Sequence, residues 1–144
     1  EVDNRKARPV GYAKQHPIAS SFASRTMLLS ASVILFFVLY HLAHFTLHEV
    51  GDHSFGPDYA GRHDVYRMVV TGFQDITITL VYIVSNLFLG LHMSHGIKSS
   101  FQSLGLRDKK YNSLVECGGI GLAWSLAIGN ISIPIAVYFG CITL

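Results

Sequence analysis

The chain has 144 residues, of which 50% are hydrophobic and only 14% are charged. Soluble domains carry about a quarter charged residues, so this composition excludes an ordinary soluble domain and indicates a membrane protein. The net charge of +2 is too small to indicate nucleic-acid binding. Cys117 and Cys141 would lie about 36 Å apart on one helix, at roughly 1.5 Å per residue, which excludes a disulfide between them.

Three apolar segments are each long enough to cross a bilayer, which takes about 20 helical residues. We predict the spans at about residues 21–48, 65–99 and 114–143. The second span is expected to begin near Val65 as a polar extension outside the hydrocarbon. The sequence therefore predicts an all-α membrane protein that forms a single transmembrane domain over residues 1–144.

Lysine and arginine are concentrated before the first span, in NRKARPVGYAK, and between the second and third spans, in KSSFQSLGLRDKKYN. The loop between the first and second spans carries only Arg62 and Arg67, beside several acidic residues. The positive-inside rule therefore places the N-terminus and the 98–112 loop on the cytoplasmic side.

The first span contains His41, His44 and His48, which share one stripe of a regular helix. Ionisable residues inside spans generally face the bundle interior and mark function. The alternative is that an imidazole bonds a neighbouring helix or lies at the headgroups. This alternative is the favoured interpretation for His48 and for His95 of the second span.

The second span contributes His92, and neutral imidazole is a good ligand for haem iron. At roughly 1.5 Å per residue, His41 lies about 24 Å from Arg25 and His92 about 9 Å from Lys98. If those two cations mark the cytoplasmic edge, the levels differ by about 15 Å, too much for two ligands of one iron. If both histidines are haem ligands, the spacing predicts two haems, each with its second ligand outside this sequence.

The third span holds no histidine, so it cannot supply the missing ligands. The missing ligands must come from helices outside this sequence, which fits its start at Glu1 rather than at a methionine. Four helices around two haems would mean that two N-terminal helices are missing, unless another anchor chain supplies them. Gly121, Ser125 and Gly129 are spaced one turn apart, which predicts close packing against another helix.

These segments resemble the membrane-anchor cytochrome b subunit of succinate dehydrogenases and fumarate reductases, in its single-subunit, di-haem form. NRKARPVGYA resembles the loop after that family's second helix, and ASRTMLLS with VLYHLAHFT resembles its third helix. LGLHMSHGIKSSFQSLGL resembles the fourth helix, and the histidine-free C-terminal span resembles the fifth. The resemblance implies helices three to five of a five-helix di-haem bundle.

The resemblance also assigns roles to individual residues. It implies that His41 and His92 are axial ligands of an outer and a cytoplasmic b-type haem, respectively. His44, His95 and Lys98 would belong to the haem pockets, although Lys98 is more simply a snorkelling surface lysine.

Ser24 and Arg25 at the cytoplasmic start of the first span are candidates for binding the quinone. Arg25 alternatively pairs with a haem propionate or anchors its helix at the lipid headgroups. Both residues precede the apolar part of the span directly.

As an enzyme subunit of this family, the chain would not hold the dicarboxylate site. It would dock a flavoprotein and an iron–sulfur subunit on the cytoplasmic face of a bacterial inner membrane. Electrons would pass from succinate through the haems to a quinone, usually menaquinone.

One position departs from the family pattern. Some fumarate reductases have a glutamate two residues before the fourth-helix ligand, implicated in moving protons, where this chain has Gly90. We therefore expect the succinate-oxidising direction and no proton route by that group.

Two alternatives stay open. The first is the membrane cytochrome b of another dehydrogenase, against which the SRTM and FQSLG stretches argue. The second is a histidine-lined metal or ion transporter, which would more often show broken helices or carboxylates near the midplane.

Overall fold

The computed structural model describes residues 22–50, 57, 59–106 and 110–144. Within this part of the chain every regular element is a helix, which confirms the predicted all-α class. The elements are α2 (Phe22–Arg25), α3 (Met27–His41), the π-helix η1 (Leu42–Thr46), α4 (Val65–Gln74), α5 (Ile76–Ser103) and α6 (Asn112–Tyr138).

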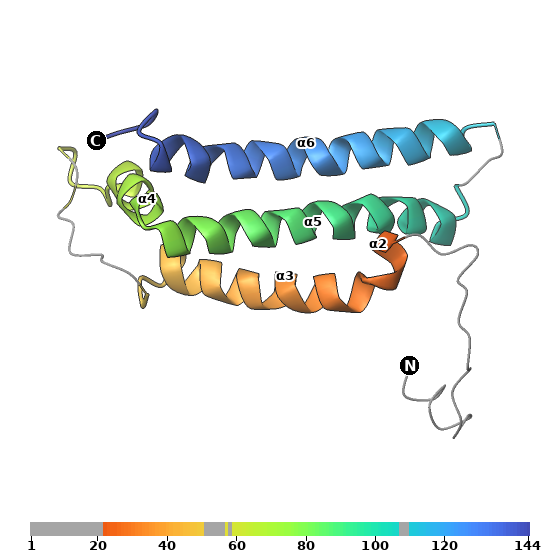
Figure 1. Ribbon diagram of the computed structural model, residues 1–144, viewed down its shortest axis with the longest axis horizontal. Helices are drawn as coiled ribbons and strands as arrows, with labels where there is room; N and C mark the ends of the chain where they lie inside the picture. The colour runs from red at the N-terminus through yellow and green to blue at the C-terminus, as the bar shows by residue number, and fades with distance from the viewer. Residues whose placement is uncertain (1–21, 51–56, 58, 107–109) are drawn as a thin grey trace, which may run out of the picture.

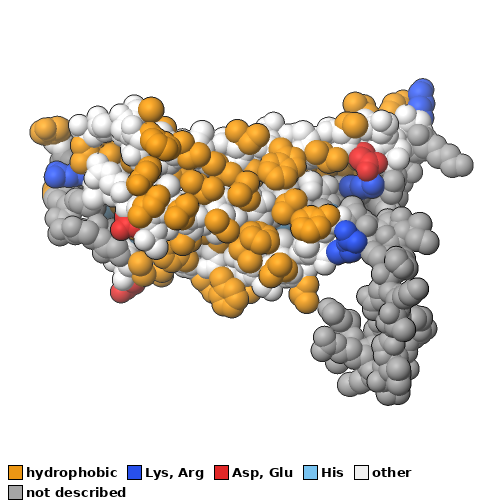
Figure 2. Space-filling view, in the orientation of Figure 1, with side chains coloured by type: hydrophobic (Ala, Val, Ile, Leu, Met, Phe, Trp, Pro, Cys, Tyr) orange, Lys and Arg blue, Asp and Glu red, His pale blue; other side chains and the backbone are white. Residues whose placement is uncertain are grey.

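Three stretches are long and apolar enough to cross a membrane, namely Met27–Thr46, Ile76–Ser103 and Asn112–Tyr138. Apolar side chains cover the visible face along the length of these helices, while the charged side chains gather near its two ends (Figure 2). This distribution matches a membrane-embedded protein, as the composition predicts.

The three long helices lie side by side in one layer, with α5 between α3 and α6 (Figure 1). The short helix α4 crosses the end of this layer and contacts both α5 and α6. Because α5 is the middle helix, its side chains face both neighbours, and the candidate site lies along it.

The expected continuous helix from Val65 through the second span is wrong, because the chain bends at Asp75. The backbone of Asp75 is extended (φ −78°, ψ 123°) and ends α4. Its carboxylate accepts hydrogen bonds from the backbone N–H groups of Thr77 (2.7 Å) and Ile78 (3.1 Å). Asp75 thus acts as the N-cap of α5, which frees α4 to lie across the layer.

The first span also departs from a regular helix. At its end the Leu47 N–H bonds the carbonyl of Leu42, five residues earlier, which is the π-helical pattern. The span therefore ends at Thr46 rather than His48, and His48 has a left-handed backbone (φ 57°). This turn removes the regular stripe that the histidine spacing predicts.

Helices α5 and α6 approach closely through small residues. A Cβ atom on Gly90 would lie 3.1 Å from the Cβ of Ala127 and 3.3 Å from the ring of Trp124. Gly121 and Gly129, by contrast, are exposed, with nothing within 4 Å of such a Cβ. The predicted stripe thus faces away from α5, and a different face of α6 makes the contact.

We expect Asp75 to make the protein's stability depend on pH. The backbone hydrogen bonds from Ile78 and Thr77 hold the pKa of this carboxyl below its ordinary value. A lowered pKa in the folded state stabilises the fold above about pH 4 and loses that contribution as pH falls through the folded-state pKa. Asp75→Asn keeps a capping oxygen that does not titrate.

Circular dichroism of the detergent-solubilised protein between pH 6 and pH 3 checks this expectation. Wild type should lose more thermal stability than Asp75→Asn at the acid end of the titration. Equal losses in both proteins would show that the cap contributes nothing to the pH dependence.

Candidate functional site

The first of two levels of the predicted site is built by α3 and α5. The Nδ1 atom of His92 on α5 lies 3.0 Å from the hydroxyl oxygen of Ser30 on α3. The same hydroxyl donates a hydrogen bond to the carbonyl oxygen of Met27, at 3.0 Å. Ser30 itself is buried, so this contact is shielded between the two helices.

These two contacts determine where the imidazole proton of His92 lies. A serine hydroxyl has one hydrogen, and a carbonyl oxygen can only accept, so that hydrogen points to Met27. The Ser30 oxygen must then accept from Nδ1–H of His92, and in the neutral form of the ring the lone pair is on Nε2. That lone pair has no partner within the described part of the chain. His92 is therefore held in the form that ligates a metal.

The second level is built around the hydroxyl group of Tyr82 on α5. It lies 3.2 Å from Nδ1 of His41 and 3.2 Å from Nδ1 of His44. The π-helical turn brings both imidazoles to one hydroxyl, although only His44 is fully buried. The rings of Phe37 and Phe73 meet the Tyr82 ring edge-on, at centroid distances of 5.0 and 4.9 Å.

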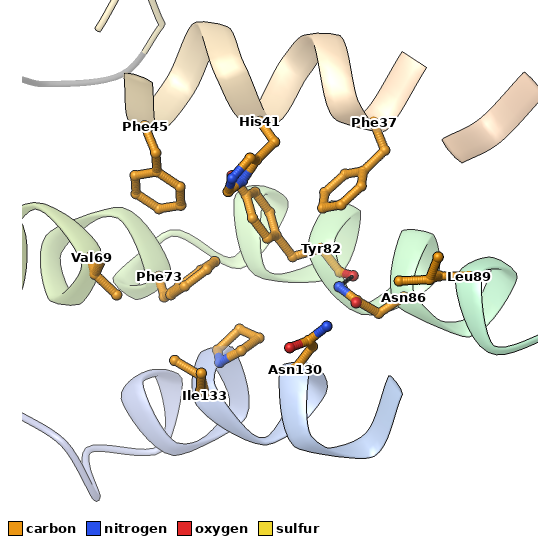
Figure 3. A pocket seen from close by; sticks show the side chains of 11 residues that line it. Phe37, His41, Phe45, Val69, Phe73, Tyr82, Asn86, Leu89, Asn130 and Ile133 are labelled. Atoms are coloured by element: carbon orange, nitrogen blue, oxygen red, sulfur yellow. Dashed lines mark hydrogen bonds between the residues drawn. The ribbon is translucent and has the colours of Figure 1, made fainter. Parts of the chain in front are cut away.

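A cavity of about 380 Å³ opens beside His41, between α3, α5 and α6, with α4 at one end. In Figure 3 the His41 side chain points from α3 towards Tyr82, while Asn86 and Asn130 approach from the other two helices. The lining of this cavity is mostly apolar. Aromatic rings lie on its α3 side, and the two amides lie opposite them. An apolar cavity with a few polar groups is the usual form of a cofactor or ligand site.

The two levels are separate along the layer. Tyr82 and His92 lie on the same helix, and at 1.5 Å per residue they are about 15 Å apart. The antiparallel pairs Ser30–His92 and His41–Tyr82 mark these levels on both helices. This spacing agrees with the level difference expected from the sequence, so His41 and His92 cannot share one metal.

The remaining predicted site residues lie elsewhere. His95 is half-buried and makes no hydrogen bond within the described part of the chain. Lys98 forms an ion pair with Glu116, which ties α5 to α6 and favours a structural role. Arg25 is the exposed last residue of α2, and Ser24 precedes it, with a side chain outside those described.

The described residues contain no group of three or more histidine, cysteine or acidic side chains that could hold a bare metal ion. A haem needs only one protein nitrogen on each side of its iron, because the macrocycle supplies the other ligands. The donor chemistry of His41 and His92, two imidazoles with Nε2 unpartnered in the described part, fits that requirement.

Sequence reasoning missed Ser30 and Tyr82, the two hydroxyl groups that hold the imidazoles. A signal was available, because Ser30 precedes His41 by about 16 Å of helix and Tyr82 precedes His92 by about 15 Å. On antiparallel neighbours this spacing places each hydroxyl at the level of the other helix's histidine.

Comparisons with protein-family models, curated proteins and solved structures give no match for this chain.

Proposed function

We propose that this chain is the membrane-anchor cytochrome b subunit of a succinate:quinone oxidoreductase. It would carry electrons through two b-type haems between an iron–sulfur subunit and a membrane quinone of the menaquinone class. The carrying observation is the pair of imidazoles at two levels, each tied by Nδ1 to a hydroxyl while its Nε2 is unpartnered in the described part.

The residues of this chain would position the cofactors. Ser30 would accept a hydrogen bond from Nδ1–H of His92 and thereby leave the lone pair on Nε2. The Tyr82 hydroxyl would likewise bond Nδ1 of His41 and leave its Nε2 for the iron. A bound b-type haem supplies a one-electron centre at each level. The rings of Phe37 and Phe73 pack against the buried Tyr82 at the second level, and an apolar surrounding influences a haem's potential.

The second ligand of each iron would come from two further helices, either of the same subunit or of another anchor chain. A flavoprotein and an iron–sulfur subunit would dock at the cytoplasmic end of the layer in a bacterial inner membrane. Ser24 and Arg25 lie at that end and are the candidates for contacting the quinone.

The transporter alternative receives less support. The described part of α5 carries no acidic residue, and its only fixed charge is Lys98, which is paired. Transport sites near the midplane commonly use intramembrane carboxylates or helices interrupted there. The one interruption of a span in this part of the chain is the π-turn at the end of the first span.

A reduced-minus-oxidised visible spectrum of the purified complex tests the proposal. We expect the absorption bands of low-spin b-type haem, with two components in a potentiometric titration. A complex without b-type bands would overturn the proposed function and the dehydrogenase alternative together. Haem present without succinate:quinone activity would favour a different dehydrogenase.

A further inference from the structure

Tyr82 makes two hydrogen-bond contacts through a single hydroxyl. Its oxygen lies 3.2 Å from Nδ1 of both His41 and His44, and it has no third partner within the described part of the chain. A phenolic hydroxyl donates one hydrogen and accepts through its oxygen. It can therefore donate to only one of the two imidazoles.

The other imidazole must donate its own Nδ1–H to the phenolic oxygen, or that contact would join two acceptors. In their neutral forms the two rings consequently hold their protons on different nitrogens. One ring carries N–H at Nδ1 and a lone pair at Nε2, and the other carries the reverse arrangement. Only the first of these forms can bind iron through Nε2.

The surroundings of the two rings decide between them. The His44 side chain is 2% exposed, and a Cβ added to Gly72 of α4 would lie 3.5 Å from its Nε2 atom. The Phe45 ring lies against His44 at a centroid distance of 4.1 Å, tilted by 30°. This packing leaves no room for a haem at His44, whereas His41 is exposed and lines the cavity.

We infer that Tyr82 is a positioning residue that holds His41 with its proton on Nδ1 and its lone pair on Nε2. Its hydroxyl hydrogen points to His44, which keeps His44 protonated at Nε2 and unable to act as a ligand. This inference rests on the proposed function for the identity of the metal. It explains why two neighbouring histidines yield one ligand.

The test compares Tyr82→Phe with Tyr40→Phe in the complete complex. Tyr40 lies in the same aromatic cluster, 6.0 Å from the Tyr82 ring, but its hydroxyl bonds neither imidazole in the described part. Tyr82→Phe should shift the midpoint potential and electron paramagnetic resonance signals of one haem, the one that His41→Ala removes. The affinity of the Tyr82→Phe complex for that haem should fall about 10- to 100-fold. Tyr40→Phe should match wild type.

A haem-independent measurement accompanies this comparison. Solid-state 15N spectra of histidine-labelled complex in vesicles, assigned with His41→Ala and His44→Ala, report which ring nitrogen carries each proton. Opposite forms in wild type, lost in Tyr82→Phe, support the inference, and the same form at both histidines overturns it. A Tyr82→Phe haem indistinguishable from that of Tyr40→Phe also overturns it, while the proposed function stands. A complex without haem overturns the proposed function instead, and the 15N result still decides the arrangement of protons.

Discussion

Replacing His92 with alanine should remove one of the two proposed haems and leave the other in place. His92 lies on the Ser30 level, about 15 Å along α5 from the Tyr82 level. Among the described residues no other imidazole bonds Ser30, so none of them is held there to replace the His92 ring. His41→Ala should remove the other haem, because the buried and tightly packed His44 cannot take the place of His41 as a ligand.

Haem content per complex, measured by the pyridine haemochrome assay, should fall by half in each variant. A potentiometric titration should show that the two variants retain different components. His63→Ala is the matched control, because His63 is exposed and lies outside the three spans. Unchanged haem in both ligand variants would refute the assignment. Loss of both haems from one variant while helicity is retained would mean that the two sites are not independent.

The sequence was sufficient to predict the class of fold and the two levels of the site. Runs of apolar residues determine which segments can cross a bilayer, and the constant rise of a helix converts residue number into depth. Those two regularities predict that the depths of His41 and His92 differ by about 15 Å, without any knowledge of packing. The structure reproduces that separation through the contacts of Ser30 and Tyr82.

The local departures from regular helix could not be predicted in the same way. Hydropathy does not distinguish a π-turn from an α-turn, since the same apolar residues satisfy both, so Leu42–Thr46 gave no signal. The bend at Asp75 depends on whether a carboxylate caps the following turn or lies on the surface of a continuing helix. The π-turn determines which way His44 faces, and the bend determines how α4 lies.

Placing a glutamate at position 90, where some fumarate reductases carry one, should disrupt the packing of this chain. Gly90 is buried, and a Cβ there would lie 3.1 Å from the Cβ of Ala127, which has no rotamer to move away. Overpacking of this kind costs about 1–3 kcal/mol, and an ionised carboxylate without a partner adds several kcal/mol more. We therefore expect Gly90→Glu to fail to assemble, or to assemble with a large loss of stability.

Two further variants separate size from charge. Gly90→Leu should lower the midpoint of unfolding in sodium dodecyl sulfate, whereas Gly129→Leu should not, because nothing lies within 4 Å of a Cβ at Gly129. Gly90→Glu should be more damaging than Gly90→Leu if the buried charge contributes. Normal assembly of Gly90→Glu would show that α6 can move away from α5 at this point. If it fails as expected, the close approach of α5 and α6 itself excludes a proton-carrying glutamate here. The absence of that group would then be a consequence of the helix packing rather than of one isolated substitution.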